Sequence, residues 1–114
     1  MPFIDLKTTK KISDGKRESL IKDFGEKIAL IPGKSERWLM VNLDGERVMA
    51  FAGSTDSDLA MLEVKLFGAA SEAAYDSLTS ALTDSVSDIL GIEKDKIYIK
   101  YEEASHWGWN GSNF

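Results

Sequence analysis

The pattern of hydrophobic and polar residues in the first half of the chain predicts a strand, a helix and a second strand. Residues 2–8 are rich in β-favouring side chains and lead into polar turn material, which is typical of a strand. Ser13 or Asp14 can cap a helix that Pro32-Gly33 ends. Its apolar residues keep helical spacing, and they are Leu20, Ile21, Phe24, Ile28 and Ile31. Residues 38–43 then predict the second strand.

The second half of the chain repeats this order. Residues 59–66 have the composition of a strand with partial alternation. A helix is predicted from about Ser71 to Leu90, with Gly91 at its exit. The apolar stripe of this helix consists of Ala74, Leu78, Leu82, Val86 and Ile89. Residues 97–101 predict the last strand.

The segment between the two halves is predicted to contain a hairpin and a loop. Asp44-Gly45 favours a turn, and residues 47–51 form a short apolar segment that can return along residues 38–43. Residues 52–57 are polar and predict a loop.

The two halves together predict the fold class. Each has the order strand, helix, strand, and residues 33–38 resemble residues 92–97, which indicates a duplicated βαβ unit. Because βαβ crossovers are right-handed, both helices can lie on one face of a four-stranded mixed sheet, an α+β fold. The other face would be bare, yet residues 38–43 are apolar at nearly every position, as in a sheet covered on both faces. Another copy of the chain is the simplest cover, so we expect a homo-oligomer.

Length and composition limit the function classes. The 114 residues fit a single domain spanning 1–114. The net charge of −5 argues against nucleic-acid binding, and the absence of cysteine excludes disulfides, thiolate metal sites and thiol catalysis. His106 is the only histidine, so no metal-ligand spacing is present, and no Gly-x-Ser-x-Gly motif supports a catalytic triad. Without a membrane span or a signal peptide, the expected location is the cytoplasm.

Pro2 is the first candidate for chemistry. If Met1 is removed, Pro2 becomes a secondary amine, and apolar walls with a nearby cation would lower its pKa towards the range of a general base. Lys34, just after the predicted end of the first helix, could bind a carboxylate. The alternatives are that Pro2 is merely tolerated near the start of the chain and has no catalytic role, and that Lys34 is a solvated surface lysine.

An aromatic cluster near the carboxyl end is the second candidate. Trp107, Trp109 and Phe114 lie within eight residues, at an end that would normally fray. Because exposed aromatic side chains are unfavourable, these rings could pack on their own subunit, cross to a neighbour or wall a small-molecule pocket.

Five segments, taken in order and spacing, resemble the macrophage migration inhibitory factor family of the tautomerase superfamily. They are Met1-Pro2-Phe3, Gly33-Lys34, Met49-Ala50-Phe51-Ala52-Gly53-Ser54, Tyr98-Ile99-Lys100-Tyr101 and Gly108-Trp109-Asn110-Gly111-Ser112-Asn113-Phe114. The resemblance covers nearly the whole chain, and the carboxyl-terminal motif together with Pro2 is its most specific part.

The resemblance implies a homotrimer in which three sheets form the wall of a barrel, with a pocket at each subunit interface. It also implies a keto-enol tautomerase of α-keto acids such as phenylpyruvate, with Pro2 as general base. We expect no cofactor and no metal. Lys34 would bind the substrate carboxylate, the backbone N–H of Val64 would add a donor, and Tyr98 would reach in from the adjacent subunit. The aromatic side of the pocket would be lined by Phe3, Trp107, Trp109 and Phe114.

Three departures from the family pattern are visible. Lys100 stands where well-known vertebrate members carry an asparagine, so a second cation is expected beside the substrate. Trp107 replaces a smaller aliphatic residue and would narrow the entrance. The Cys-x-x-Cys of vertebrate members is absent, which excludes thiol oxidoreductase activity.

The resemblance also leaves a second function open. The chain could be a cytokine-like or host-modulating binding protein that recognises a receptor, has little physiological catalysis and is secreted by a non-classical route.

Overall fold

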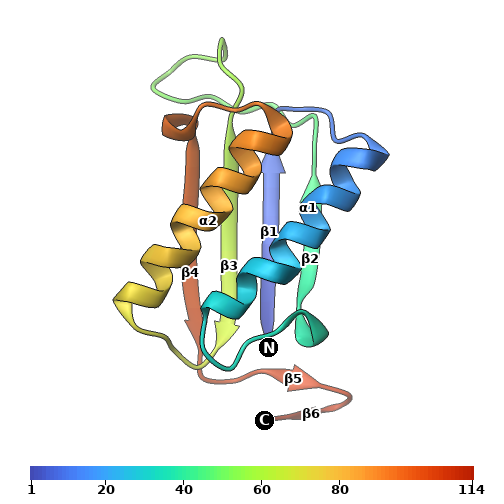
Figure 1. Ribbon diagram of the computed structural model, residues 1–114, viewed down its shortest axis with the longest axis vertical. Coiled ribbons are helices and arrows are strands. Elements are labelled where there is room, and N and C mark those ends of the chain that lie inside the picture. The colour runs from blue at the N-terminus through green and yellow to red at the C-terminus, as the bar shows by residue number, and fades with distance from the viewer.

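The computed structural model describes residues 1–114 and contains one main sheet, two helices and a small terminal hairpin (Figure 1). The main elements are β1 (Pro2–Thr8), α1 (Asp14–Lys27), β2 (Met40–Asp44), β3 (Ala60–Phe67), α2 (Glu72–Leu90) and β4 (Ile97–Ala104). Short 3-10 turns are η1 (Ile28–Leu30), η2 (Glu36–Trp38) and η3 (Lys94–Lys96), and the terminal hairpin is β5 (Gly108–Trp109) and β6 (Ser112–Asn113). No helix is both long and apolar enough to cross a membrane.

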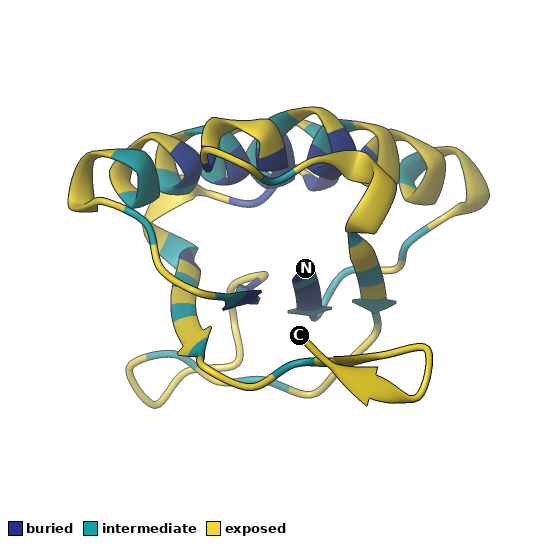
Figure 2. Cartoon of the chain, turned by 90° about the horizontal axis from the view of Figure 1, so that it is seen from below, coloured by how far each residue is buried: buried dark blue, intermediate teal, exposed yellow.

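The predicted mixed sheet is confirmed. Its strand order is β2-β1-β3-β4, with β1 and β2 parallel, β3 and β4 parallel, and β1 and β3 antiparallel. Each helix connects two neighbouring parallel strands, so the chain consists of two βαβ units joined at β1 and β3. Figure 2 shows both helices in one layer on the same side of the sheet.

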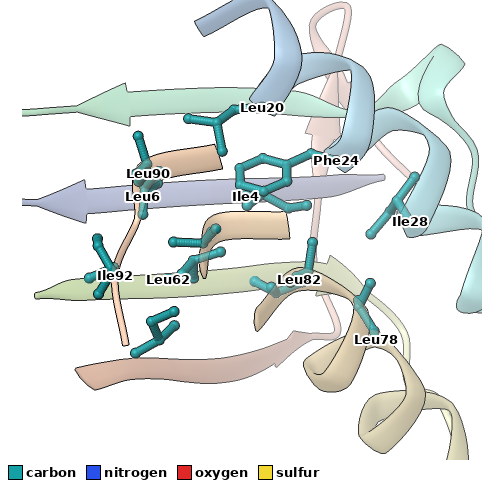
Figure 3. Close-up of a cluster of buried hydrophobic side chains, with 14 of the residues drawn as sticks. Ile4, Leu6, Leu20, Phe24, Ile28, Leu62, Leu78, Leu82, Leu90 and Ile92 are labelled. Atoms are coloured by element: carbon teal, nitrogen blue, oxygen red, sulfur yellow. The ribbon is translucent and has the colours of Figure 1, made fainter. Parts of the chain in front are cut away.

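The core lies between the helix layer and the sheet (Figure 3). Phe24 of α1 and Leu82 of α2 are fully buried against Ile4 of β1 and Leu62 of β3. In β3 every second residue is buried, which is the alternation of a sheet with one covered face. The hydroxyl oxygens of Ser13 and Ser71 accept hydrogen bonds from the backbone at 3.4 and 3.1 Å, so serine rather than Asp14 caps the first helix.

The internal repeat extends to the turns before the strands. η2 precedes β2 and η3 leads into β4, at corresponding positions of the two βαβ units. These are the segments whose sequences resemble each other, so the local repeat has a structural counterpart.

Three local predictions require correction. The α-helical part of the first helix ends at Lys27 and continues as η1, and Ile21, expected on the apolar stripe, is 44% exposed. The second strand begins at Met40, because residues 36–38 form the turn η2, in which the Leu39 N–H donates to the Glu36 carbonyl at 3.1 Å.

The predicted hairpin over residues 47–51 is wrong. The backbone N–H groups of Glu46 and Arg47 donate to the carbonyls of Lys10 and Thr8 at 2.9 and 3.0 Å. These bonds lead the chain across the end of β1 instead of back along β2. Phe51 forms only an isolated bridge with Ser54.

The open face of the sheet is polar in its middle rather than continuously apolar. Asp5 of β1 accepts hydrogen bonds from Asn42 at 2.8 Å and from Lys7 at 2.6 Å, and Lys7 also lies 3.8 Å from Glu63. Burial would raise the pKa of the Asp5 carboxyl, but the hydrogen bonds from Asn42 and Lys7 outweigh it and the pKa is lowered. The apolar character of residues 38–43 therefore reflects Val41 and Leu43, which pack against the helix-side core.

Candidate active site

A pocket of about 590 Å³ opens at the end of the sheet where β1 begins. Three segments far apart in the sequence line it: residues 1–3, residues 37–40 and residues 107–109. Figure 1 shows the amino terminus close to η2 and the terminal hairpin. A volume of this size is typical of a small-molecule site, and 7 of the 10 lining residues are hydrophobic.

Pro2 is the first residue of β1 and is buried. A proline fits the start of a strand, because the missing N–H is not needed in the ladder there. Met1 precedes Pro2, and the pKa of its terminal amine is lowered. The largest cause is burial, and the positive charge of Lys34 and a hydrogen bond with the Lys34 side chain contribute further. An amine at this end of the chain is therefore in surroundings that favour its neutral, basic form.

Lys34 lies beside the amino terminus. Its backbone N–H donates to the Ile31 carbonyl at 3.0 Å, which closes the turn after η1. Its side chain reaches across to β3 and donates to the Phe67 carbonyl at 2.8 Å. Lys34 forms no ion pair with a carboxylate, so its positive charge is available at this end of the sheet.

Val64 is not part of this site, contrary to the sequence prediction. In the middle of the sheet it pairs with Ile4 on one side and Tyr101 on the other, and its side chain is buried. Because Pro2 pairs with Leu66, the amide beside the amino terminus belongs to Phe67. Its N–H donates to the Met1 carbonyl at 3.1 Å.

The aromatic tail folds back on its own subunit and forms one wall of the pocket. Asn110 and Gly111 have φ of 51° and 88°, as required by the tight turn between β5 and β6. The rings of Trp109 and Trp38 meet edge to face at 5.2 Å between centroids. The ring centroid of Phe114 lies 6.2 Å from that of Trp109 and 5.8 Å from that of Phe67. Phe114 itself does not line the pocket, contrary to the sequence prediction, and contacts the wall through Trp109.

Phe3, Trp107 and Trp109 all line the pocket, whereas Tyr98 and Lys100 do not. Tyr98 pairs with Met61, towards the opposite end of β3 from Pro2, and is 59% exposed. Lys100 pairs with Glu63 and forms an ion pair with Glu102 at 3.0 Å. Any role of these two residues in catalysis therefore requires the pocket of another subunit.

No group of three or more His, Asp or Glu side chains is placed to hold a metal ion. His106 is exposed, and its ring nitrogen Nδ1 lies 3.2 Å from the hydroxyl of Ser105.

Five residues at or beside the pocket are not predicted by the sequence: Arg37, Trp38, Leu39, Met40 and Phe67. The sequence predicts only a strand for Trp38, Leu39 and Met40, and Arg37 belongs to no motif. The one available signal was the resemblance between residues 33–38 and residues 92–97. It indicates that both segments form the same kind of turn before a strand, as η2 and η3 do. Phe67 follows from the β1–β3 register, which the sequence pattern did not reveal.

The duplicated βαβ sheet, with an aromatic pocket over the first residue of β1, defines a small α+β protein of the tautomerase fold. Comparison with known proteins agrees, since the macrophage migration inhibitory factor (MIF) family matches residues 1–114. The chain belongs to this family.

Individual relatives support the assignment. Macrophage migration inhibitory factor from Meriones unguiculatus is 31% identical over 101 residues, 85% of each chain. The crystal structure of Leishmania major MIF2 has a TM-score of 0.93 at 28% identity and covers 100% of this chain and 97% of that one. A homologue from Prochlorococcus marinus has a TM-score of 0.86 at 31% identity, covering 98% of each chain.

Proposed function

We propose that the chain, after removal of Met1, catalyses the keto-enol tautomerisation of phenylpyruvate-type α-keto acids with Pro2 as general base. One observation carries the proposal: the buried Pro2 lies at an aromatic pocket whose only charged lining side chain is a cation, Arg37, with Lys34 beside the amino terminus. An aromatic acid complements such a site in both shape and charge.

The proposed reaction moves one proton from carbon to oxygen. The Pro2 nitrogen takes a proton from the carbon next to the keto group, and the electrons of that C–H bond form the carbon–carbon double bond of the enol. The π electrons of the keto C=O bond move onto its oxygen, which takes up a proton and becomes the enol hydroxyl. The protonated Pro2 amine gives up its proton and is regenerated, so the net change is one proton moved from carbon to oxygen. Burial and the charge of Lys34, which lower the pKa of the terminal amine here, would keep the Pro2 amine neutral enough to act as a base.

The hydrogen bond between Phe67 and Met1 supports this arrangement. The Met1 carbonyl accepts from the Phe67 N–H, while Lys34 lies beside the same terminus. Removal of Met1 takes away the acceptor, so an oxygen of the substrate carboxylate can accept from the Phe67 N–H and the other can bind Lys34. Phe67 thus takes the donor role that the sequence prediction gave to Val64.

A homotrimer is part of the proposal. β2 and β4 are the two edges of the sheet, and each has one side unpaired within the subunit. Met40 on β2 is 69% exposed and Tyr98 on β4 is 59% exposed. In a trimer of neighbouring sheets, Tyr98 and Lys100 of one subunit would approach the pocket of the next. Sedimentation equilibrium tests this, and a monomer at micromolar concentration would contradict it.

The decisive experiment compares the wild type with Pro2→Gly. Intact mass first establishes that Met1 has been removed, because a retained Met1 turns the Pro2 nitrogen into a non-basic amide. Tautomerisation of phenylpyruvate and hydroxyphenylpyruvate is then followed by absorbance. We expect turnover by the wild type and its loss in Pro2→Gly at unchanged oligomeric state; equal rates would refute the proposal.

A second candidate function is a cytokine-like or host-modulating binding protein. It is favoured by the relatives, several of which are named for macrophage migration inhibition. In that case saturable binding to a receptor would persist in Pro2→Gly, and a correctly processed protein without turnover would make this the leading function.

A further inference from the structure

We propose that Arg37 binds a second anionic group at the distal end of the ligand, so that the preferred substrates are aromatic α-keto acids with a carboxylate on the ring. This inference deepens the proposed function and rests on it for the identity of the reacting end.

Arg37 is held at the pocket by its local structure. It is the middle residue of η2, where the Trp38 N–H donates to the Ser35 carbonyl at 3.2 Å. The guanidinium carbon lies 5.1 Å from the centroid of the Trp38 ring, a cation–π distance. Trp38 in turn contacts Trp109 of the terminal hairpin. The cation therefore lies over the aromatic wall.

Arg37 has no carboxylate partner, unlike the other two arginines of the chain. Arg17 pairs with Asp14 and Arg47 with Asp44, each through an i,i+3 contact. The neighbouring Glu36 does not compensate Arg37, because its carboxyl end lies against Gly25 of α1. In a chain of net charge −5, an unpaired guanidinium at a pocket is a site for an external anion.

Lys34 and Arg37 serve different parts of the site. Lys34 lies beside the amino terminus and the Phe67 carbonyl, where the reacting keto acid would bind. Arg37 instead lines the aromatic part, together with Trp38 and Trp109. A ligand held by Lys34 at its keto acid would therefore place its ring between the aromatic walls and its far end near Arg37. A guanidinium can hold a carboxylate through two parallel hydrogen bonds, which a phenyl ring alone cannot use.

Lys100 is the competing cation for this role. It forms an ion pair with Glu102 at 3.0 Å and lines no part of the pocket of its own subunit. Because Glu102 already neutralises Lys100, the unpaired Arg37 is the stronger binder of a second carboxylate.

Binding of two unreactive ligands tests the inference without requiring turnover. Cinnamate carries one carboxylate, and 4-carboxycinnamate adds a second at the far end of the ring. Isothermal titration calorimetry measures both on the Met1-free wild type, Arg37→Gln and Lys100→Gln. Arg47→Gln is the matched control, because it removes the same charge from an exposed arginine outside the pocket.

We expect the wild type and Arg47→Gln to bind 4-carboxycinnamate about tenfold more tightly than cinnamate, and Arg37→Gln to lose that preference. Added salt should weaken wild-type binding of the dianion more than that of the monoanion. No preference in the wild type, or a preference that disappears in Lys100→Gln and survives in Arg37→Gln, would overturn the inference.

The two proposals fail separately. If the selective binding is found but phenylpyruvate and 4-carboxyphenylpyruvate are not turned over, the tautomerase proposal fails while the anion-binding role of Arg37 stands. If phenylpyruvate is turned over but 4-carboxyphenylpyruvate has no higher kcat/KM, the tautomerase stands and the proposed preference for substrates with a ring carboxylate is refuted.

Discussion

Replacing Lys34 by glutamine tests the electrostatic half of the proposed mechanism. Two effects are expected, because the lysine would bind the substrate carboxylate and also lowers the pKa of the terminal amine, after burial. Glutamine keeps a polar side chain of similar length without the charge. Lys22→Gln, on the exposed surface of α1, is the matched control.

The size of the first effect follows from the contact that is removed. A hydrogen bond to a charged group contributes about 1.5–3 kcal/mol, so kcat/KM for phenylpyruvate should fall about 10- to 150-fold. Lys34 forms no competing ion pair whose loss would add to this figure, although its bond to the Phe67 carbonyl at 2.8 Å is also lost. Urea denaturation of both variants measures that structural contribution separately.

The second effect appears in the pH profile of kcat/KM. Pro2 must be neutral to act as a base, so activity falls on the acid side as the amine becomes protonated. Without the charge of Lys34 the amine pKa rises, and the acid limb should move to higher pH in Lys34→Gln but not in Lys22→Gln. An acid limb at the wild-type position, or an equal loss of activity in Lys22→Gln, would refute this reasoning.

Two further predictions concern stability. The pKa of the Asp5 carboxyl is lowered from its ordinary value of 3.8 on folding, so its interactions stabilise the protein above that value and are lost as the pH falls through the folded-state pKa. The Tm difference between the wild type and Asp5→Asn should therefore be largest at neutral pH and shrink below about pH 4. A Tm difference that stays constant with pH would contradict a stabilising role of the Asp5 carboxylate. Gly91 ends α2 with φ of 69°, and no atom lies within 4 Å of the place where a Cβ would stand. Gly91→Ala should therefore lower the free energy of unfolding by about 1–2 kcal/mol through backbone strain alone. Gly15→Ala in α1, equally unobstructed, should be neutral or stabilising in urea denaturation, and equal losses would exclude the strain explanation.

Most of the fold could be predicted from local patterns. Both helices have buried residues at helical spacing. Buried residues alternate along β3 and are concentrated in β1. The spacing of apolar residues in the sequence is therefore enough to predict these four elements. The failures lie where distant contacts decide. Residues 47–51 have strand composition, but the hydrogen bonds of Glu46 and Arg47 to the end of β1 take the chain elsewhere.

The candidate site was predictable in part for a similar reason. Pro2, Lys34 and the aromatic tail carry distinctive chemistry, and the structure brings them to one end of the sheet. The donor assigned to Val64 depended on the β1–β3 register, which places Phe67 there instead. Arg37 was missed because one arginine among 14 basic residues has no signature until its neighbours are known. The roles of Tyr98 and Lys100 in an adjacent subunit stay predictions.

The pocket is lined by residues near both ends of the chain, residues 1–3 and 107–109. Figure 1 shows the two ends of the chain close to each other at one end of the sheet. This affects how the protein can be handled in the laboratory. An affinity tag fused to the amino-terminal end would keep the Pro2 nitrogen in an amide bond. A tag fused after Phe114 would begin next to the ring that stacks on Trp109. A peptide inserted into the exposed loop at residues 52–58, which lies at the far end of the sheet, would leave both borders of the pocket unaltered.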